Sequence, residues 1–167
     1  LFRSCGECKR CREGRTNLCD KYVTLGLNRH GGMAEYVAVP TSTLVAVPNG
    51  LNLDAAGIAQ PLAVGLHAAR RSGVRDGDKV LLIGAGAIGT FVLAGLKKLF
   101  KAEVTVMDFG GSRLERASRL GADHTVEVGD NAEADIKKIF GEGGIDVVIE
   151  ASGAPGQLPF ADRKSVV

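Results

Sequence analysis

The feature that most constrains the fold is the stretch Lys79–Gly89, which reads KVLLIGAGAIG. Its first part, VLLI, is a continuous apolar run, typical of a parallel strand that is buried on both faces. The run leads directly into the spacing G-x-G-x-x-G, formed by Gly84, Gly86 and Gly89. Apolar residues then recur at helical spacing over Ile88–Phe100. A G-x-G-x-x-G alone is weak evidence, but between a strand and a helix it predicts a turn that binds a dinucleotide.

Each glycine has a separate physical role in such a turn. The first, Gly84, makes the tight turn, and the second, Gly86, lets the backbone approach a diphosphate. The third, Gly89, allows the helix to pack closely on the strand. The diphosphate would then lie on unpaired N–H groups at the positive end of the helix.

A second strand is predicted over Glu103–Asp108 (EVTVMD), and it ends in a carboxylate 24 residues after Gly84. A carboxylate there accepts hydrogen bonds from the ribose 2′- and 3′-hydroxyls and repels a 2′-phosphate. Two alternatives stay open: Asp108 could simply cap the next helix, and Arg113 could accommodate a 2′-phosphate. Because the carboxylate stands at the strand tip, we predict that the cofactor is NAD.

Further strands and helices continue the alternation. A short, half-exposed strand and a buried apolar strand are expected, each preceded by a helix. The predicted strands are 124–128 and 145–151, and the predicted helices are about 111–120 and 133–140. The order β-α-β-α-β-α-β predicts an α/β fold that contains the first half of a doubly wound parallel sheet. The second half, which would complete a nicotinamide site, has no counterpart in this sequence.

All four cysteines lie in one stretch with the spacing C-x2-C-x2-C-x7-C. Disulfides normally restrain distant parts of a small fold, so they fit poorly here. An iron–sulfur cluster is an alternative, but the fourth cysteine comes seven residues on and Asp20 replaces the usual proline. A structural zinc ion with four thiolate ligands fits best. The predicted ligands are Cys5, Cys8, Cys11 and Cys19.

The many basic residues around the cysteines do not require a nucleic acid. Four thiolates and one Zn²⁺ carry a net charge of −2, and cationic side chains would favour the deprotonated ligands. These side chains are Arg3, Lys9, Arg10, Arg12 and Arg15. The formal net charge of the chain is only +2, which argues against nucleic acid and against an anionic membrane surface. No apolar run approaches the length of a membrane span.

The combination of these stretches resembles the zinc-containing medium-chain dehydrogenase/reductase superfamily over roughly residues 3–154. Further matching segments connect and follow the cysteine and glycine stretches. They are Gly31–Val37, Pro61–Gly65, Asp108 with Arg113, Gly121–Asp123 and Glu150–Gly153. Within the superfamily the chain is most similar to sorbitol, butanediol and threonine dehydrogenases, and glucose dehydrogenases are close relatives.

The resemblance implies a fold and a reaction. The parallel sheet would be part of a Rossmann domain, preceded by a remnant of a mostly-β GroES-like catalytic domain that carries the structural zinc lobe. Ile88, Asp108 and Arg113 would line the adenosine half of the NAD site together with the three glycines. The family oxidises a secondary alcohol, with a second, catalytic zinc as Lewis acid and NAD as hydride acceptor.

One matched position departs from the polyol branch of the family. The residue before Pro61 is usually glutamate, whereas here it is Gln60, whose amide oxygen could bind the catalytic zinc as in some archaeal glucose dehydrogenases. A neutral amide cannot act as a base, so a proton relay would need water or another group. The alternative is that Gln60 only begins a helix.

The family's main catalytic-zinc ligands are a cysteine and a histidine–glutamate pair, which lie upstream of the cysteine lobe. None of the three histidines, His30, His67 and His124, is followed by glutamate, and no fifth cysteine is present. We therefore expect this chain to be a fragment of a longer enzyme that alone turns over little or no substrate. A non-catalytic scaffold that binds NAD and zinc is the rival hypothesis.

The remaining expectations concern organisation and context. The resemblance implies a catalytic-domain remnant over 1–55 and a partial NAD-binding domain over 56–167. Residues 157–167 show no family pattern, so they are expected to be a truncated or foreign end without a function. Reduced thiols favour the cytoplasm. A homo-oligomer is expected for the full-length protein, whose alcohol or polyol substrate the sequence does not identify.

Overall fold

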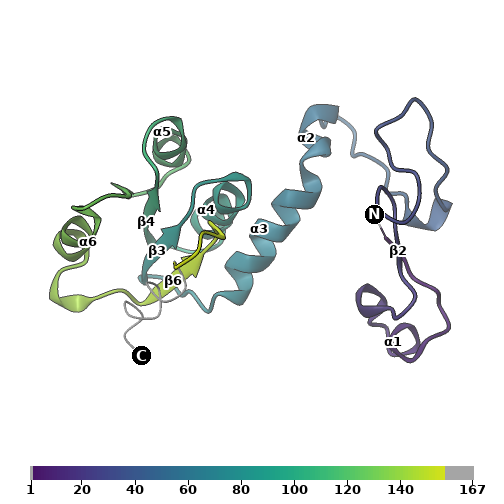
Figure 1. Cartoon of the computed structure of the whole chain (residues 1–167), viewed down its shortest axis with the longest axis horizontal. Coiled ribbons are helices and arrows are strands. Elements are labelled where there is room, and N and C mark those ends of the chain that lie inside the picture. Colours follow the sequence, from purple (N-terminus) through teal and green to yellow (C-terminus); the bar gives the residue numbers. More distant parts are fainter. Residues whose placement is uncertain (1, 157–167) are drawn as a thin grey trace. The chain divides into compact units, whose positions relative to one another are not determined.

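The computed structural model describes residues 2–156, and the contacts within the chain define two compact units. The first unit ends at Leu51 and the second begins at Asn52 (Figure 1). The first contains a two-stranded antiparallel sheet, and the second contains a four-stranded parallel sheet.

The first unit has little regular structure and few buried side chains. Its elements are β1 (Phe2–Arg3), α1 (Lys9–Arg12), η1 (Thr16–Leu18), β2 (Val23–Thr24) and η2 (Thr41–Thr43). Among its described residues Cys19 alone is fully buried, whereas Met33, Tyr36 and Val45 are almost completely exposed. Since a small domain without an apolar core needs another source of stability, this unit is of the kind that a bound metal holds together.

The second unit alternates helices and strands. Its elements are α2 (Leu53–Gly57), α3 (Ala59–Arg71), β3 (Lys79–Ile83), α4 (Ala87–Leu99), β4 (Glu103–Asp108), α5 (Ser112–Arg119), β5 (His124–Glu127), α6 (Ala132–Phe140), η3 (Gly141–Gly143) and β6 (Val147–Glu150). The order from β3 to β6 confirms the predicted β-α-β-α-β-α-β alternation and the α/β fold class.

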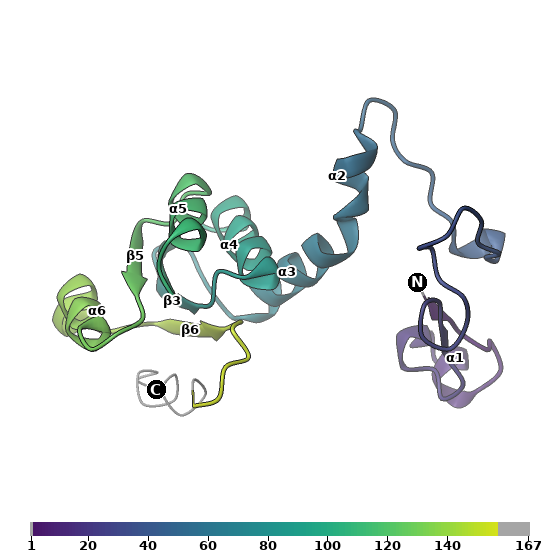
Figure 2. The same cartoon turned by 45° about the horizontal axis from the view of Figure 1, so that its top comes forward.

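The parallel sheet has the strand order β5-β4-β3-β6. The chain runs outward from β3 to β5 and then returns to place β6 on the other side of β3. Helices α4 and α5 therefore pack on one face of the sheet and α6 on the other, as Figure 2 shows. In open α/β sheets, ligands bind at the carboxyl ends of the strands where the order reverses. Here that point lies between β3 and β6.

Two apolar clusters, one on each face, hold the helices to the sheet. On the face of α4, the strand residues Val80, Leu82 and Val104 contact Val92 and Leu96, and all five are at most 1% exposed. On the opposite face the apolar residues of the strands and α6 form the second cluster, which includes Leu81, Ile83, Met107, Ile136 and Phe140. Alternate residues of β3 and of β6 thus face opposite layers, which explains why the sequence of each of these two strands is a nearly continuous apolar run.

A close helix crossing explains one matched glycine in the sequence. Helix α3 packs against α4, and a Cβ built on Gly65 would lie 2.5 Å from both the carbonyl carbon and the Cβ of Phe91. Only glycine fits this contact without a shift of the backbone. Helices α3 and α4 have 13 residues each, and within the described part of the chain no helix has the length and apolarity needed to cross a membrane.

Element boundaries differ from the sequence predictions by one or two residues. Helix α4 begins at Ala87 rather than Ile88, and β6 covers Val147–Glu150 within the predicted 145–151. The hydrogen-bond ladder nevertheless extends beyond β6, because Ala151 N donates to Ile83 O at 2.8 Å. Such end effects are usual where strands and helices fray. Residues 157–167, to which the sequence assigns no function, lie outside the described residues.

Candidate functional site

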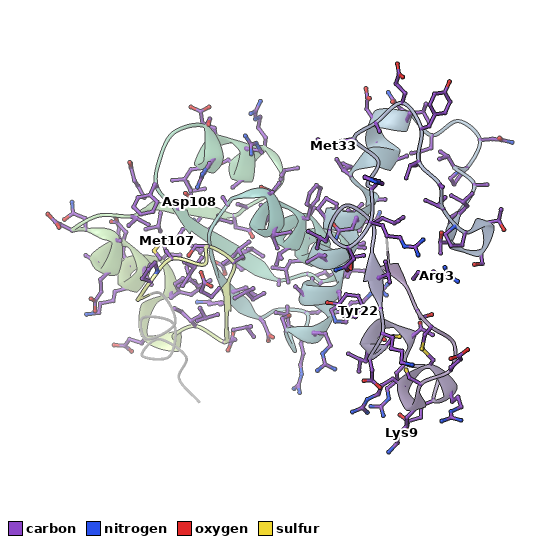
Figure 3. The ribbon with its side chains drawn as sticks, turned by 45° about the vertical axis from the view of Figure 1, so that its right-hand side comes forward. Arg3, Lys9, Tyr22, Met33, Met107 and Asp108 are labelled. Carbon is purple, nitrogen blue, oxygen red and sulfur yellow. The ribbon has the colours of Figure 1, made fainter. Side chains whose placement is uncertain are left out.

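The four cysteine sulfurs of the first unit come together around one point. All lie within 4.8 Å of one another, and three Sγ–Sγ pairs are 3.6, 3.9 and 4.0 Å apart. A tetrahedral shell with zinc–sulfur bonds of about 2.3 Å has edges of about 3.8 Å. The distances are far too long for disulfide bonds, and all four cysteines are free thiols. The site therefore has the dimensions of a four-thiolate zinc centre. Figure 3 shows the sulfurs in yellow, beside Lys9 and α1.

Backbone N–H groups surround the sulfurs. Cys5 Sγ accepts hydrogen bonds from Glu7 N at 3.4 Å and Cys8 N at 3.3 Å, and Cys19 Sγ accepts from Cys5 N and Lys21 N at 3.3 Å each. The bonds from Glu7 N and Cys8 N lower the pKa of Cys5 to about 6. N–H groups of Asp20 and Cys11 likewise lower the pKa of Cys8. These donors favour the thiolate form, which metal binding requires.

The Cys11 thiol shows why the cluster needs a cation. Burial raises the pKa of Cys11 to about 12, and hydrogen bonds to the other sulfurs add to this shift. Four thiolates in contact repel one another strongly unless a metal ion compensates their charge. The arrangement thus fits a divalent ion that accepts four sulfur ligands and leaves no position open for a substrate.

Three of the basic side chains near the cysteine cluster pair with one carboxylate, that of Glu13. Lys9 and Arg10 lie 3.9 Å from carboxylate oxygens of Glu13, and Arg15 also pairs with that carboxylate. Each of these cations is at least 42% exposed, so the ion pairs contribute little to stability. The N–H donors to the sulfurs come from the backbone.

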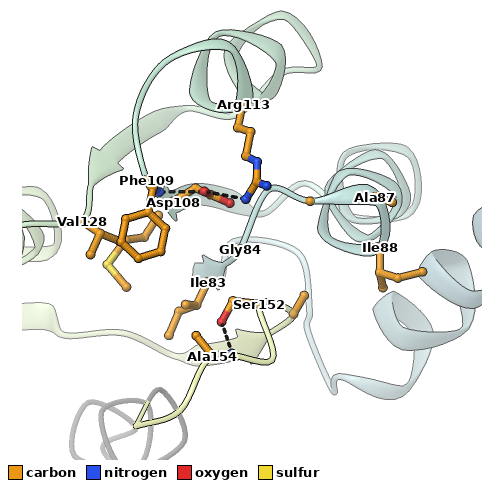
Figure 4. Close-up of a pocket in the computed structure, with 13 residues that line it drawn as sticks. Ile83, Gly84, Ala87, Ile88, Asp108, Phe109, Arg113, Val128, Ser152 and Ala154 are labelled. Carbon is orange, nitrogen blue, oxygen red and sulfur yellow. Dashed lines mark hydrogen bonds and ion pairs between the residues drawn. The ribbon is translucent and has the colours of Figure 1, made fainter.

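A pocket of about 340 Å³ lies at the carboxyl ends of β3, β4 and β6 in the second unit. It occupies the point where the strand order reverses (Figure 4). Most of the lining is apolar, with the polar groups gathered at the strand ends. The lining residues are Ile83, Gly84, Gly86, Ala87, Ile88, Met107, Asp108, Phe109, Arg113, Val128, Ala151, Ser152 and Ala154.

The three glycines differ in what surrounds them. Gly84 has φ of +98°, and a Cβ built on it would lie 2.7 Å from Ser152 N. A Cβ on Gly89 would lie 1.9 Å from Gly84 O, so helix α4 contacts the turn directly. At Gly86 nothing lies within 4 Å of the Cβ position, and this residue precedes the first residue of α4. The open space at Gly86 therefore adjoins a helix N-terminus, where unpaired N–H groups attract an anion.

Asp108 at the end of β4 is 5% exposed, and both of its oxygens accept hydrogen bonds. Oδ2 accepts from Ala85 N at 2.6 Å, so the carboxylate fixes the glycine-rich turn. Oδ1 accepts from Phe109 N at 2.6 Å and from the Arg113 guanidinium at 3.2 Å, and Figure 4 shows both contacts as dashed lines. Within the described residues this carboxylate is thus a structural acceptor as well as a candidate ribose ligand.

The loop after β6 forms a wall of the pocket that the sequence analysis did not assign to the site. One oxygen of Glu150 accepts hydrogen bonds from Ser152 N at 2.7 Å, from the Ser152 hydroxyl and from Gly153 N at 3.0 Å. Burial acts to raise the pKa of Glu150, but these hydrogen bonds outweigh it and lower the pKa. The matched segment Glu150–Gly153 could have drawn attention to this loop, although its place beside Gly84 depends on the strand order.

The candidate nucleotide residues come together, and the candidate catalytic residue lies elsewhere. Gly84, Gly86, Ile88, Asp108 and Arg113 all line the pocket, and Gly89 lies directly beneath the turn. The candidate catalytic residue, Gln60, is exposed near the start of α3 and does not line this pocket.

The three histidines are absent from the cysteine cluster, which is the one group of three or more potential metal ligands within residues 2–156. His30 is an exposed loop residue, and His67 lies within α3. His124 begins β5, where its Nε2 lies 3.2 Å from a Glu103 oxygen.

Two family models match this chain. "Alcohol dehydrogenase GroES-like domain" matches residues 1–49, and "Zinc-binding dehydrogenase" matches residues 87–162. The first match contains the cysteine cluster, and the second begins at the start of α4, directly after the first two glycines of the turn.

Curated proteins match over nearly the whole chain. An L-threonine 3-dehydrogenase from Rhizobium johnstonii is 36% identical over 90% of this chain and 44% of its own length. A sorbitol dehydrogenase from Bacillus subtilis is 31% identical over 95% of this chain and 45% of its own length. The chain thus spans somewhat less than half the length of these relatives.

Solved structures share the fold. An alcohol dehydrogenase from Escherichia coli CFT073 in complex with NADH has a TM-score of 0.84 at 29% identity, over 98% of this chain and 49% of its own. A protein from Sinorhizobium meliloti described as a zinc-binding dehydrogenase, bound to NADP, has a TM-score of 0.85 at 32% identity over the same shares. These two structures hold different nicotinamide dinucleotides.

Proposed function

Since this chain belongs to the zinc-containing medium-chain dehydrogenase/reductase family, of the threonine and sorbitol dehydrogenase type, we propose that it is part of an NAD-dependent alcohol or polyol dehydrogenase. One observation carries the proposal. A glycine-rich turn, a helix N-terminus and an acidic strand end converge on a single pocket, in the same chain as four thiols with zinc-site dimensions.

The proposed metal of the first unit is a structural zinc ion held by Cys5, Cys8, Cys11 and Cys19. Support comes from the sulfur separations, the N–H donors and the lowered pKa of two thiols. Zinc in such a shell supplies cross-linking rather than chemistry, because all four positions are taken by protein ligands.

The proposed cofactor of the second unit is NAD. In this assignment the diphosphate lies at Gly86 and the first N–H groups of α4, where the built Cβ position is open. Asp108 and Arg113 would orient the adenosine ribose, and Ile88 and Phe109 would offer apolar contacts at the mouth of the pocket. When bound, NAD supplies the hydride acceptor for oxidation of an alcohol.

The proposed substrate class is a small secondary alcohol or polyol. Threonine and sorbitol, which the names of two relatives contain, both carry secondary hydroxyl groups. In the family a second zinc acts as the Lewis acid, and we propose the Gln60 amide oxygen as one contributor to that site. The described residues do not provide a full ligand set for this second zinc. Their one group of three or more potential metal ligands is the four cysteines, which are all assigned to the structural zinc.

We therefore expect the 167-residue chain alone to bind zinc and NAD but to oxidise alcohols slowly or not at all. A non-catalytic scaffold that binds both ligands would behave in the same way. The two hypotheses separate when the chain is extended: an enzyme gains alcohol-dependent NADH formation, and a scaffold does not. Because four thiols must stay reduced, we propose a cytoplasmic location, and we propose a homo-oligomeric full-length protein.

The direct test measures metal and cofactor on the purified chain. We expect one zinc per chain by elemental analysis, four sulfur neighbours by X-ray absorption and saturable NADH binding by fluorescence. Sorbitol, butanediol and threonine then serve as substrates for the chain and for a longer polypeptide that includes it. Iron and visible charge-transfer colour, or the failure of NADH to bind, would refute the proposal.

A further inference from the structure

Glu127 is an acidic residue beside the pocket that the proposed function leaves unassigned. It is the last residue of β5, and in the parallel pairing it stands opposite Asp108, the last residue of β4. The next residue, Val128, donates its N–H to Asp108 O at 2.9 Å and lines the pocket. Glu127 is exposed, and within residues 2–156 its carboxylate has no hydrogen-bond or ion-pair partner.

The Glu127 carboxylate lies against the loop that joins β4 to α5. A Cβ built on Gly110 would lie 2.2 Å from Glu127 Oε1 and 2.6 Å from its carboxyl carbon. Any side chain at position 110 would therefore displace the carboxylate. The negative charge of this exposed side chain is thus located beside Gly110, two residues after Asp108.

The charge of Asp108 is already compensated. Its oxygens accept hydrogen bonds from Ala85 N, Phe109 N and the Arg113 guanidinium, and its side chain is 4% exposed. A carboxylate with these partners has much of its charge neutralised. It repels a neighbouring anion less than a free carboxylate would.

The surroundings of Asp108 would otherwise attract a phosphate. Helix α5 begins at Ser112, directly after Gly111, so its first N–H groups and the positive end of its dipole face this loop. Arg113 is 55% exposed and can contact a 2′-phosphate. The N-terminus of α5 and Arg113 would attract a 2′-phosphate, and the charge of Asp108 is compensated by its partners. The charge that opposes a 2′-phosphate is therefore that of Glu127.

We infer that Glu127, through its unpaired carboxylate against Gly110, is the residue that sets a preference for NAD over NADP at this pocket. The inference rests on the proposed function, because it assumes that a nicotinamide dinucleotide binds here. Glu127 contributes repulsion against one ligand without contacting the other, which is one way in which binding sites achieve specificity.

The test compares Glu127→Gln with the unchanged 167-residue chain by fluorescence titration with NADH and NADPH, which differ only in the 2′-phosphate. We expect NADPH to bind about tenfold more tightly to the variant at low salt, and NADH to bind within twofold of the unchanged chain. Because the effect is electrostatic, the gain should shrink to about twofold at 0.5 M salt, where exposed charges are screened. A merely structural role would not give this salt dependence.

Two further variants sharpen the test. Glu142→Gln removes the same charge from η3, beside Lys79 at the amino end of the sheet, and should leave the NADPH-to-NADH ratio unchanged. Glu127→Asp keeps the charge and should keep that ratio within about threefold.

The outcomes are distinguishable. If the unchanged chain binds neither dinucleotide, the proposed function is wrong and the inference fails with it. If NADH binds but Glu127→Gln leaves the ratio unchanged, or weakens both ligands equally, the inference alone is overturned.

Discussion

The main effect of replacing Asp108 by alanine should be a loss of stability in the second unit, rather than a change in the preference for NAD over NADP. The variant leaves Ala85 N–H, which belongs to a residue only 3% exposed, without its 2.6 Å acceptor. A buried donor left unpaired costs about 1–3 kcal/mol. The other two partners weigh less: Phe109 is exposed to water, and the half-exposed Arg113 contributes at most about 1 kcal/mol.

These terms add to a loss of about 2 kcal/mol in the free energy of unfolding, out of the roughly 5–15 kcal/mol typical of a domain. For a chain of this size the melting temperature should fall by about 4–8 °C. Asp108→Asn should cost about 1 kcal/mol, because its one amide oxygen can still accept from Ala85 N. Glu142→Ala, which removes an exposed carboxylate, is the control and should stay within about 0.5 kcal/mol of the unchanged chain.

The assay is urea unfolding of the zinc-saturated chain followed by far-ultraviolet circular dichroism. Hydrogen exchange at the Ala85 amide gives a local measurement, which should be slow in the unchanged chain and in Asp108→Asn but fast in Asp108→Ala. If Asp108→Ala unfolds within 0.5 kcal/mol of the unchanged chain and the Ala85 amide stays protected, the structural role assigned to this carboxylate is wrong.

Three other perturbations test separate parts of the structure. Gly65→Ala should destabilise the chain by about 1–3 kcal/mol in urea unfolding, because its Cβ would overlap the Phe91 backbone, whereas Gly57→Ala, with nothing within 4 Å of its Cβ, should be neutral. Glu150 has a folded-state pKa below the 4.5 of an unperturbed glutamate, so its stabilisation is present above pH 4.5 and is lost as pH falls through the lower folded-state pKa. Urea midpoints of the unchanged chain should thus converge with those of Glu150→Gln as the pH falls below 4.5. Removal of zinc by a chelator should abolish amide protection in the first unit and expose four thiols to a thiol reagent. NADH affinity should stay within about twofold, because the proposed NAD site lies in the second unit. Loss of NADH binding on zinc removal would contradict this assignment of the two ligands to separate units.

The alternation of the second unit could be predicted because buried parallel strands leave an unambiguous pattern. Runs such as VLLI at positions 80–83 and VVI at 147–149 are apolar on both faces, since each of these two strands contributes to both clusters. The strand order could not be read in the same way. Strand β6 lies beside β3 because the chain returns across the sheet after β5. This pairing joins segments far apart in the sequence, and no local sequence pattern predicts it.

The parts of the site that could be predicted are those set by local backbone geometry. Gly84 must adopt a positive φ and Gly86 must leave space, so both requirements appear in the motif itself. The contact of Ser152 with Gly84 joins residues 68 positions apart and depends on the neighbouring strand. The position of the Glu127 carboxylate against Gly110 depends in the same way on the pairing of β5 with β4.

Asp108 shows why the presence of a motif residue does not by itself establish a preference for NAD over NADP. From the sequence, a carboxylate at this strand end predicts rejection of a 2′-phosphate. In the structure the same carboxylate fixes the glycine-rich turn through Ala85 and is paired with Arg113. Its removal therefore perturbs the turn that both NAD and NADP would use, and a change in affinity for either would not isolate charge repulsion. To measure how charge repulsion contributes to cofactor selectivity, the substituted carboxylate must have no structural partner. Among the acidic residues at the carboxyl ends of β4 and β5, Glu127 fits that description.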